Sequence, residues 1–254
     1  MVFTVLLYYH FVPIENPEEL VTQQRALCEK LELKGRILIG EEGINGTVAG
    51  LPEQIEAYKQ GVWEDPRFTT MVFKESKAET MPFPKLKIKL RPEIISLHQE
   101  VRVKHAADSY RTPEQLHALY ESGEEFYLLD ARNKYESDEG GFKGAVLPAI
   151  NHFRELPKIL DSIKDLRDKK IVTYCTGGIR CEKASALLQE YGFDKVYQLE
   201  GGIVSYIMQY PDTYFEGDCY VFDDRMRLTQ QEIAKNGAIS QAPQCLVPQS
   251  LVLE

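Results

Sequence analysis

A cysteine in a predicted tight loop is the residue of this sequence whose type and setting point most clearly to chemistry. Cys175 lies between a strand-forming run and a helix-forming run in the stretch IVTYCTGGIRCEKASALL. The residues after it are Thr176, Gly177, Gly178, Ile179 and Arg180. Adjacent glycines let a loop close tightly, so its backbone N–H groups, the start of the next helix and Arg180 all favour a thiolate. We therefore expect the pKa of Cys175 to lie below the free-thiol value of about 8.5 and the residue to act as a nucleophile.

Cys181, directly after Arg180, is the second candidate for the essential thiol. It is predicted to begin the helix, and the helix dipole would lower the pKa of a thiol at that end as well. The same spacing would let it act as a resolving thiol for an oxidised Cys175. The loop favours Cys175 as the nucleophile, but the residues do not decide which thiol is essential.

The elements around this loop predict a parallel sheet that is covered by helices on both faces. Strands are expected at Phe126 to Leu129, Ile171 to Tyr174 and Lys195 to Leu199, and helices from Thr112, from Glu155 to Leu166 and from Glu182. The first helix opens on the capping box Thr112-Pro113-Glu114-Gln115. Strands that alternate with helices are typical of parallel sheets, whose ligands bind beyond the carboxyl ends of the strands. Cys175 is predicted to lie at such an end.

Asp130 and Arg132 also follow a predicted strand. They are either walls of the active site or an ion pair that fixes the loop, and the sequence favours neither interpretation. The acidic run from Glu136 to Glu139 is predicted to be a solvated surface.

The first part of the chain predicts a ferredoxin-like sandwich with the element order β-α-β-β-α-β. Its strands are expected at Val2 to Tyr9, Arg36 to Ile39, Thr47 to Ala49, Phe68 to Phe73 and Leu86 to Leu90, with helices from about Leu20 to Gly35 and from Leu51 to Tyr58. Asn45-Gly46 is predicted to form a hairpin turn, because both residues tolerate positive φ.

The net charge of −9 argues against nucleic acid binding, but one segment is locally basic. Residues 81–111 contain seven Lys and Arg residues and only three Asp and Glu residues. Lys85, Lys87, Lys89 and Arg91 alternate with apolar residues, so a strand would place all four charges on one face. They would contact phosphates there, or they would guard an edge strand against aggregation.

Composition indicates a cytoplasmic globular protein that neither spans nor enters a membrane. The chain has 254 residues, of which 43% are hydrophobic and 27% charged. No apolar run approaches the length of a membrane span, and the start MVFTVLLYYHFVP has neither a basic leader nor a cleavage site. Five cysteines, an odd number at irregular spacing, argue against a secreted disulfide framework.

Residues around the cysteine loop resemble the rhodanese superfamily, whose members carry sulfur as a cysteine persulfide. The resemblance lies in the loop itself, in LLDAR from Leu128, in GGFKGA from Gly140 and in YQLEGG from Tyr197. A narrower resemblance rests on EEGINGT, CTGGIRCEKAS and CYVFDDRM and covers about residues 1–227. These stretches resemble the bacterial tRNA uridine hydroxylases, which are rhodanese-containing proteins that form 5-hydroxyuridine at the wobble nucleotide with molecular oxygen.

The predicted elements, the local charge and this resemblance together predict a domain order. A ferredoxin-like, or acylphosphatase-like, domain is expected over residues 1–91, a basic interdomain segment over 92–111 and a rhodanese domain over 112–212. A C-terminal extension over 213–254 is expected to be flexible beyond residue 228.

The resemblance also implies tRNA as the partner, oxygen as co-substrate, an unidentified reductant and no bound cofactor. Because EGIN is a signature of these hydroxylases, Asn45 is a weak candidate for substrate contact. Several relatives continue into a cysteine-rich segment that looks metal-binding. Only Cys219 and Cys245 remain here, whereas a closed zinc site needs four ligands, so we expect no metal. No protein partner can be deduced.

Three other functions are compatible with a reactive cysteine loop. A Cys-x5-Arg phosphatase needs arginine at the sixth position after the nucleophile, but Arg180 is fifth and Cys181 sixth. A sulfurtransferase that passes persulfide sulfur to an acceptor is the conservative alternative. A redox sensor, in which Cys181 resolves an oxidised Cys175, is the third.

Overall fold

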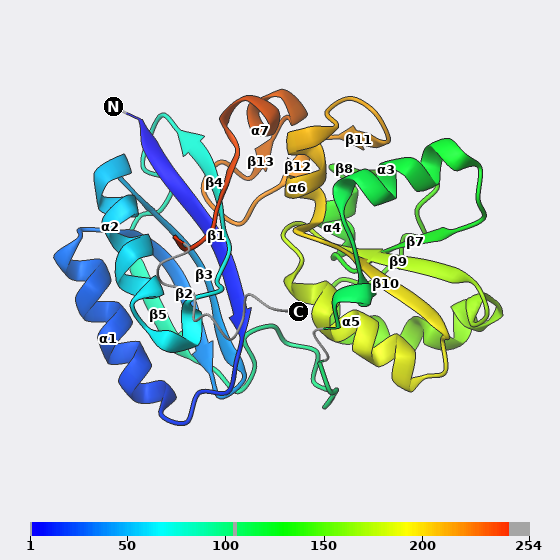
Figure 1. The fold of residues 1–254 in the computed structure, drawn as a ribbon, viewed down its shortest axis with the longest axis horizontal. Helices are drawn as coiled ribbons and strands as arrows, with labels where there is room; N and C mark the ends of the chain where they lie inside the picture. Colours follow the sequence, from blue (N-terminus) through cyan, green and yellow to red (C-terminus); the bar gives the residue numbers. More distant parts are fainter. Residues whose placement is uncertain (1, 104–105, 244–254) are drawn as a thin grey trace. The chain divides into compact units, whose positions relative to one another are not determined.

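The computed structural model describes residues 2–103 and 106–243 (Figure 1). The chain divides into two compact units. The first unit consists of Met1–Ile94 together with the residues from Asn236 onward, and the second unit consists of Ile95–Lys235. In the part of the chain that is described, no helix is long and apolar enough to cross a membrane.

The first unit is built on a six-stranded sheet in the order β14-β4-β1-β3-β2-β5. Its elements are β1 (Phe3–Phe11), α1 (Pro17–Lys30), β2 (Lys34–Gly40), β3 (Gly43–Gly50), α2 (Pro52–Trp63), the 3-10 turn η1 (Pro66–Phe68), β4 (Phe73–Ala78), β5 (Leu86–Leu90) and β14 (Ala238–Ser240). The strands pair antiparallel except for β5, which runs parallel to β2 at one edge. The order β1-α1-β2-β3-α2-β4 is the predicted ferredoxin-like order.

The two helices cover one face of this sheet (Figure 1). Ile37 and Ile39 of β2 and Ile88 of β5 point into that core, where they meet residues such as Leu20 of α1 and Ile55 of α2. Because successive side chains of a strand point to opposite faces, the residues between them lie on the other face. The charged residues of β2 and β5 therefore point away from the core.

Two predictions in the first unit are wrong in position. The β2–β3 turn lies at Glu41 and Glu42, and Asn45-Gly46 lies inside β3, where Asn45 pairs with Leu38. Gly46 is required there by close approach, because a Cβ would collide with the Tyr8 ring. The fourth strand begins at Phe73 instead of Phe68, since Asp65 accepts a hydrogen bond from the Arg67 N–H and caps the η1 turn.

The sequence predicts a flexible tail beyond residue 228, but most of the residues that the structure describes there are in regular secondary structure. They form α7 (Gln230–Asn236) and then β14, which pairs antiparallel with the edge strand β4. Lys59 Nζ donates a hydrogen bond to Ser240 Oγ at 3.1 Å and so anchors this strand. The tail shows little periodicity because its order comes from an existing sheet edge and not from an apolar pattern of its own.

The second unit contains the predicted parallel sheet, in the order β6-β10-β9-β7. The elements are the 3-10 turn η2 (Ala107–Ser109), β6 (Tyr110–Arg111), α3 (Pro113–Ser122), β7 (Tyr127–Asp130), α4 (Lys134–Ser137), β8 (Gly140–Phe142), the 3-10 helix η3 (Phe153–Leu166), β9 (Lys170–Tyr174), α5 (Ile179–Glu190), β10 (Lys195–Leu199), α6 (Gly202–Gln209), β11 (Phe215–Gly217), β12 (Cys219–Tyr220) and β13 (Arg227–Leu228). Strands β8 and β11 pair with each other, as do β12 and β13.

Helices cover both faces of this sheet, as predicted (Figure 1). Ile171 and Cys175 belong to the core beneath α5 and η3, whereas Val172 and Tyr174 belong to the core beneath α3 and α6. One segment differs, because the predicted helix from Glu155 is a 3-10 helix that contains Pro157. Proline lacks the N–H that an α-helical turn would use, and the alternative turn still buries Leu156.

Candidate active site

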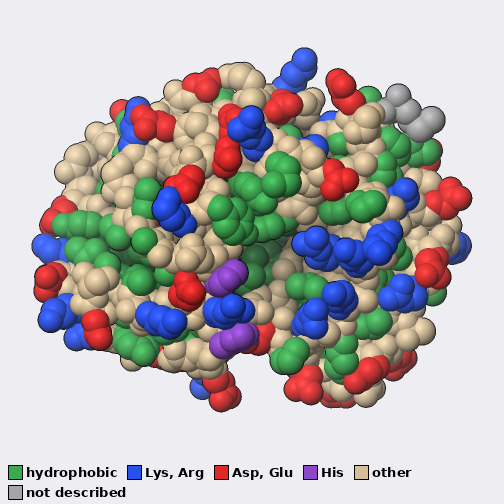
Figure 2. Space-filling view, turned by 180° about the vertical axis from the view of Figure 1, so that it is seen from behind, with side chains coloured by type: hydrophobic (Ala, Val, Ile, Leu, Met, Phe, Trp, Pro, Cys, Tyr) green, Lys and Arg blue, Asp and Glu red, His purple; other side chains and the backbone are tan. Residues whose placement is uncertain are grey.

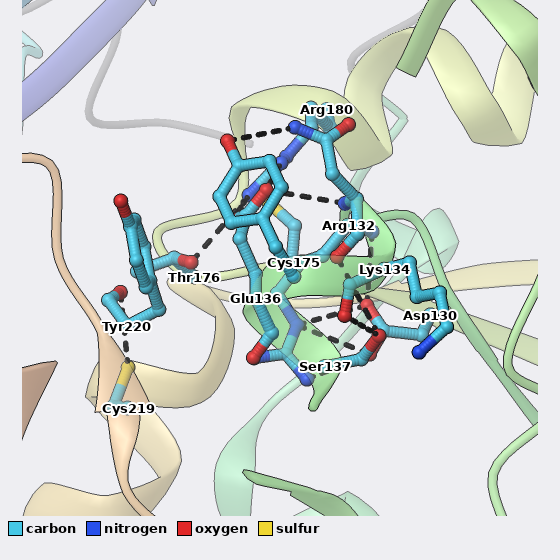
Figure 3. A network of polar contacts seen from close by, with 12 residues as sticks. Asp130, Arg132, Lys134, Glu136, Ser137, Cys175, Thr176, Arg180, Cys219 and Tyr220 are labelled. Carbon is cyan, nitrogen blue, oxygen red and sulfur yellow. Dashed lines mark hydrogen bonds and ion pairs between the residues drawn. The ribbon is translucent and has the colours of Figure 1, made fainter. Parts of the chain in front are cut away.

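The Cys175 sulfur lies in a loop of backbone amides beyond the carboxyl end of β9 (Figure 3). The Gly178 N–H donates a hydrogen bond to Cys175 Sγ at 3.1 Å. The loop is held from below by α6, because the N–H groups of Ile203 and Val204 donate to the carbonyl oxygens of Cys175 and Thr176. Cys175 is completely buried, so the sulfur sits in a shaped enclosure and not at the open surface.

Charge in this enclosure favours a thiolate at Cys175. Burial alone would raise the pKa of Cys175, but the Cys181 thiol, the Arg180 charge and the backbone N–H groups of Arg180 and Gly178 outweigh it. The pKa of Cys175 therefore lies well below the ordinary thiol value. This direction is the one that the loop sequence predicts.

Cys181 has the opposite character. It is buried in the first turn of α5, and its N–H donates to the Gly178 carbonyl oxygen at 3.0 Å. Burial, together with the hydrogen bond to Cys175 and the repulsion by its thiolate, raises the pKa of Cys181. The pair therefore consists of a thiolate at Cys175 and a thiol at Cys181 that donates to it.

Arg180 is held beside the loop by a carboxylate that the sequence analysis missed. Its Nη1 and Nη2 atoms donate to Glu136 Oε1 and Oε2 at 2.6 and 2.7 Å, and both side chains are buried (Figure 3). Nη2 also lies 3.5 Å from Thr176 Oγ1. The expectation that the run from Glu136 is solvated is therefore wrong for Glu136, because a buried guanidinium needs a counter-charge.

A signal for Glu136 exists in the sequence. Glu136 follows β7, and β7 lies next to β9, the strand that leads to Cys175. Loops after adjacent parallel strands meet at the same edge, so an acid after β7 is placed to meet Arg180. Which of the acids in the run turns inward depends on the α4 turn, and that turn was not predicted.

Asp130 and Arg132 form a buried ion pair that shapes the loop carrying Glu136. Arg132 Nη2 donates to Asp130 Oδ2 at 2.7 Å, and the Arg132 N–H donates to Asp130 Oδ1 at 2.9 Å. The same guanidinium donates to the carbonyl oxygens of Glu136 and Gly140 at 3.3 and 2.6 Å. Of the two interpretations open in the sequence, this geometry corresponds to the ion pair that fixes the loop.

The CYVFDDRM stretch lies next to these residues in the second unit. Cys219 and Tyr220 form β12, and Figure 3 shows them near Thr176 and Glu136. The Phe222 ring lies over the Arg180 guanidinium, at 5.7 Å from its centroid to Cζ. A part of the sequence that had no chemical assignment therefore borders the reactive loop.

The other predicted site residues lie in the first unit. Asn45 Nδ2 donates to the Ile94 carbonyl oxygen at 2.9 Å, so the side chain ties β3 to the chain after β5. Lys85, Lys87, Lys89 and Arg91 are exposed on or beside the edge strand β5. They extend one face with Lys34 and Arg36 of the neighbouring β2, and Arg36 pairs in register with Lys87. We call these six residues the basic face. In Figure 2, Lys and Arg side chains occur across the whole view, and a cluster of them lies to the right of its centre.

Among the described residues, no group of three or more His, Cys, Asp or Glu side chains is placed to hold a metal ion. Cys219 is buried, and Cys245 lies outside the described residues.

Comparisons with known proteins agree with this arrangement. The model of the UPF0176 acylphosphatase-like domain matches residues 3–94, and the rhodanese-like domain model matches residues 112–209. These matches confirm the predicted fold of an acylphosphatase-like domain followed by a rhodanese-like domain.

Two curated relatives extend the match across both units. A tRNA uridine(34) hydroxylase of Onion yellows phytoplasma is 46% identical over 231 residues, which cover 88% of this chain and 74% of the relative. A tRNA uridine(34) hydroxylase of Bacillus cytotoxicus is 45% identical over 229 residues, which cover 88% of this chain and 70% of the relative. The chain therefore belongs to the tRNA uridine(34) hydroxylase family.

Proposed function

We propose that this chain hydroxylates C5 of uridine 34 in tRNA and forms 5-hydroxyuridine. The observation that carries the proposal is the Cys175 thiolate in its amide loop, within a chain 46% identical to a tRNA uridine(34) hydroxylase. We propose that molecular oxygen is the co-substrate. One oxygen atom enters the 5-hydroxyl group, and the other leaves as water with two electrons from a reductant and two protons. No resident cofactor is part of this proposal.

A thiolate addresses the difficulty of this reaction, which is that C5 of uracil is a poor nucleophile. Addition of Cys175 Sγ to C6 moves the electron pair of the C5–C6 double bond to C5, which can then form a bond to oxygen. Loss of the C5 proton and departure of the thiolate restore the double bond and free Cys175. In a second route, a sulfur donor first converts Cys175 to a persulfide, which then supplies the two electrons. Its outer sulfur takes up the second oxygen atom as an S–OH group, in place of the release of water.

The neighbours of Cys175 have separate roles in this proposal. The Cys181 thiol and the loop amides stabilise the negative sulfur before and after addition. Arg180, oriented by Glu136, supplies the positive charge that matches the thiolate and the negative charge that develops on uracil. Because Cys175 is buried, side chains above the loop must move before a base reaches the sulfur.

The basic face offers the tRNA backbone a surface of positive charge in an otherwise acidic protein. Its six cations make no ion pair or hydrogen bond with other side chains among the described residues. Cations that are not neutralised by the protein are available to phosphates. The cytoplasm, where tRNA is found and thiols remain reduced, is the compartment that this function requires.

The direct test compares tRNA from a strain that lacks the gene with tRNA from the same strain carrying the restored gene. Mass spectrometry of digested tRNA should find a wobble nucleoside heavier than uridine by one oxygen only with the restored gene and only in air. Cys175→Ser should abolish this product. If Cys181 is essential, Cys181→Ser should abolish it as well; if Cys181 only assists, Cys181→Ser should slow its formation.

A rhodanese-type sulfurtransferase is the alternative, favoured by the rhodanese-like domain match over residues 112–209. It would give a thiolated nucleoside, or thiocyanate from thiosulfate and cyanide. Identical wobble nucleosides with and without the gene in air would refute the hydroxylase proposal.

A further inference from the structure

Three aromatic rings form a connected and partly exposed surface at the edge of the reactive loop. Tyr135 and Tyr220 have ring centroids 5.2 Å apart, and Tyr220 and Phe222 are also 5.2 Å apart, both pairs in edge-to-face geometry. Tyr135 is 45% exposed and Phe222 is 40% exposed, although neither is needed to cover a core. We call Tyr135, Tyr220 and Phe222 the aromatic platform.

The platform is rigid because two structured turns carry it. Tyr135 lies in α4, where its hydroxyl accepts a hydrogen bond from Asn133 Nδ2 at 3.0 Å. Tyr220 and Phe222 lie at the β12–β13 hairpin, whose loop is closed by a hydrogen bond from the Val221 N–H to the Met226 carbonyl oxygen at 2.9 Å. Within that loop, Nε and Nη2 of Arg225 donate hydrogen bonds to Oδ1 and Oδ2 of Asp223 at 2.7 and 2.6 Å. Fixed rings bind a flat partner with little loss of side-chain entropy.

The platform is continuous with the chemistry of the loop. Phe222 lies over Arg180, and Tyr135 directly precedes Glu136, which holds Arg180. The Phe222 ring therefore borders the guanidinium that stabilises the Cys175 thiolate, and the Tyr135 ring is linked to Phe222 through the Tyr220 ring. A partner bound on the platform would be delivered to the edge of the loop.

The chemistry of this surface matches an unpaired nucleobase. Exposed aromatic rings beside an arginine are the groups on which bases of single-stranded RNA stack. A base that is to be modified must leave its own stack, and a protein surface that stacks the neighbouring bases offsets that cost. The phosphate backbone, by contrast, is bound by cations, which the platform itself lacks.

We propose that the aromatic platform stacks bases of the anticodon loop that flank uridine 34 and so presents that nucleotide to the Cys175 loop. This inference rests on the proposed function for the identity of the RNA. It assigns recognition of the unpaired bases to Tyr135, Tyr220 and Phe222, whereas the tRNA backbone would be bound elsewhere.

The test uses the full chain and a short RNA hairpin whose loop is an anticodon loop with uridine at the wobble position and 2-aminopurine next to it. Stacking on an aromatic ring quenches 2-aminopurine fluorescence. The wild-type chain should bind this RNA with quenching, and Phe222→Leu and Tyr135→Leu should each weaken binding roughly tenfold and reduce quenching. Phe222→Trp and Tyr135→Phe keep a ring and should retain both properties.

Two controls separate stacking from damage to the loop. Tyr191→Leu removes an exposed ring at the end of α5 and should leave RNA binding unchanged. The rate at which iodoacetamide labels Cys175 should be the same in the platform variants as in the wild type, because Phe222 is not required for the amide loop. A changed labelling rate together with weaker binding would show that Phe222 acts through Arg180, and that result would overturn the inference.

The remaining outcomes are also decisive. Unchanged binding and quenching in Phe222→Leu and Tyr135→Leu, or equal loss in Phe222→Leu and Phe222→Trp, would refute stacking. Mass spectrometry of tRNA from the gene-deleted strain restored with the wild-type gene or with each variant reports the proposed function separately. A wild-type chain that hydroxylates uridine while the leucine variants bind normally keeps the function and refutes the platform. A chain that binds and quenches through Phe222 without hydroxylating keeps the platform and refutes the function.

Discussion

The pKa of Cys175 is lowered by groups that are themselves held in place by other residues. The thiolate depends on Arg180, Arg180 depends on Glu136, and the loop that carries Glu136 depends on the Asp130–Arg132 pair. Each member is buried, so no water is available to replace a missing partner. Changes of single residues should therefore have larger effects here than at the surface.

The lowered pKa of Cys175 predicts an unusual pH profile for alkylation. Because the folded pKa is lowered, the thiolate is already formed at about pH 7, and the labelling rate of Cys175 should stay nearly flat up to about pH 9. It should fall only as acid protonates the sulfur. Burial raises the pKa of Cys28 and Cys219 to about 12, so these residues should label slowly at both pH values.

Labelling is followed by mass spectrometry of tryptic peptides after treatment with iodoacetamide. All four cysteines in the described part of the chain are buried. Differences between their labelling rates should therefore reflect the pKa of each thiol and not its exposure. A Cys175 rate that rises about tenfold per pH unit, as an ordinary thiol requires, would contradict the amide-loop argument.

The Arg180–Glu136 pair should be strongly coupled in stability. Glu136→Gln and Arg180→Met each leave a buried charge without its partner and should each lower the free energy of unfolding by about 3 kcal/mol. The double variant should cost less than the sum of the two, because it removes both charges. Urea unfolding followed by circular dichroism measures this.

The exposed Lys134–Asp138 pair is the matched control, and Asp138→Asn should change stability by less than about 0.5 kcal/mol. Additive costs of Glu136→Gln and Arg180→Met would mean that the pair is not coupled.

At the scale of elements, the loop is shaped by the approach of β9 to the start of α6. Gly202 makes this approach possible, because a Cβ there would meet the backbone of Cys175, Thr176 and Gly178. The helix that follows the cysteine and the helix that supports it are thus both placed by backbone contacts.

Gly202→Ala should lower both stability and the labelling rate of Cys175. Gly202 has φ +69°, where alanine costs about 1–2 kcal/mol, and the collision with the loop adds to that cost. Gly123 has the same φ of +69°, but a Cβ there would meet no atom within 4 Å, so Gly123→Ala isolates the cost of φ alone. Equal effects of the two substitutions, measured by urea unfolding and iodoacetamide labelling, would show that close packing against the loop is unimportant.

At the scale of the whole molecule, a cluster of positive charge lies on one surface although the net charge is negative. The protein has a net charge of −9, yet the six exposed cations of the basic face lie on or beside β5 and β2. An acidic protein with such a face would orient a polyanion toward one surface and repel it from others. The net charge alone is therefore a poor guide to nucleic acid binding here.

Reversal of Lys87 and Lys89 to glutamate should weaken binding of tRNA and reduce its salt dependence. The slope of log affinity against log salt concentration should fall by about one unit for each phosphate that the protein no longer neutralises. Lys195→Glu, an exposed reversal in the second unit, should have a smaller effect. Unchanged binding at low salt would leave the lysines with their alternative role of protecting the edge strand β5.

The local features of this protein are determined by its sequence. The strand before Cys175, the glycine loop, the capping box at Thr112 and the alternation of Lys87 with Ile88 all arise from neighbouring residues. Those patterns were sufficient to predict the two domain folds and a thiol of lowered pKa at the end of a parallel strand. They were sufficient because periodicity and turn chemistry act over a few residues.

Contacts between distant residues were decided only by the tertiary structure. Glu136 is one acid in a polar run until the fold places it against Arg180, 44 residues later. Asn45-Gly46 has the composition of a turn, but the Tyr8 ring packs over Gly46. Residues 238–240 lie in a stretch without apolar periodicity and become a strand because β4 offers an open edge. In each case a partner far along the chain supplies the deciding energy, and local sequence carries no record of that partner.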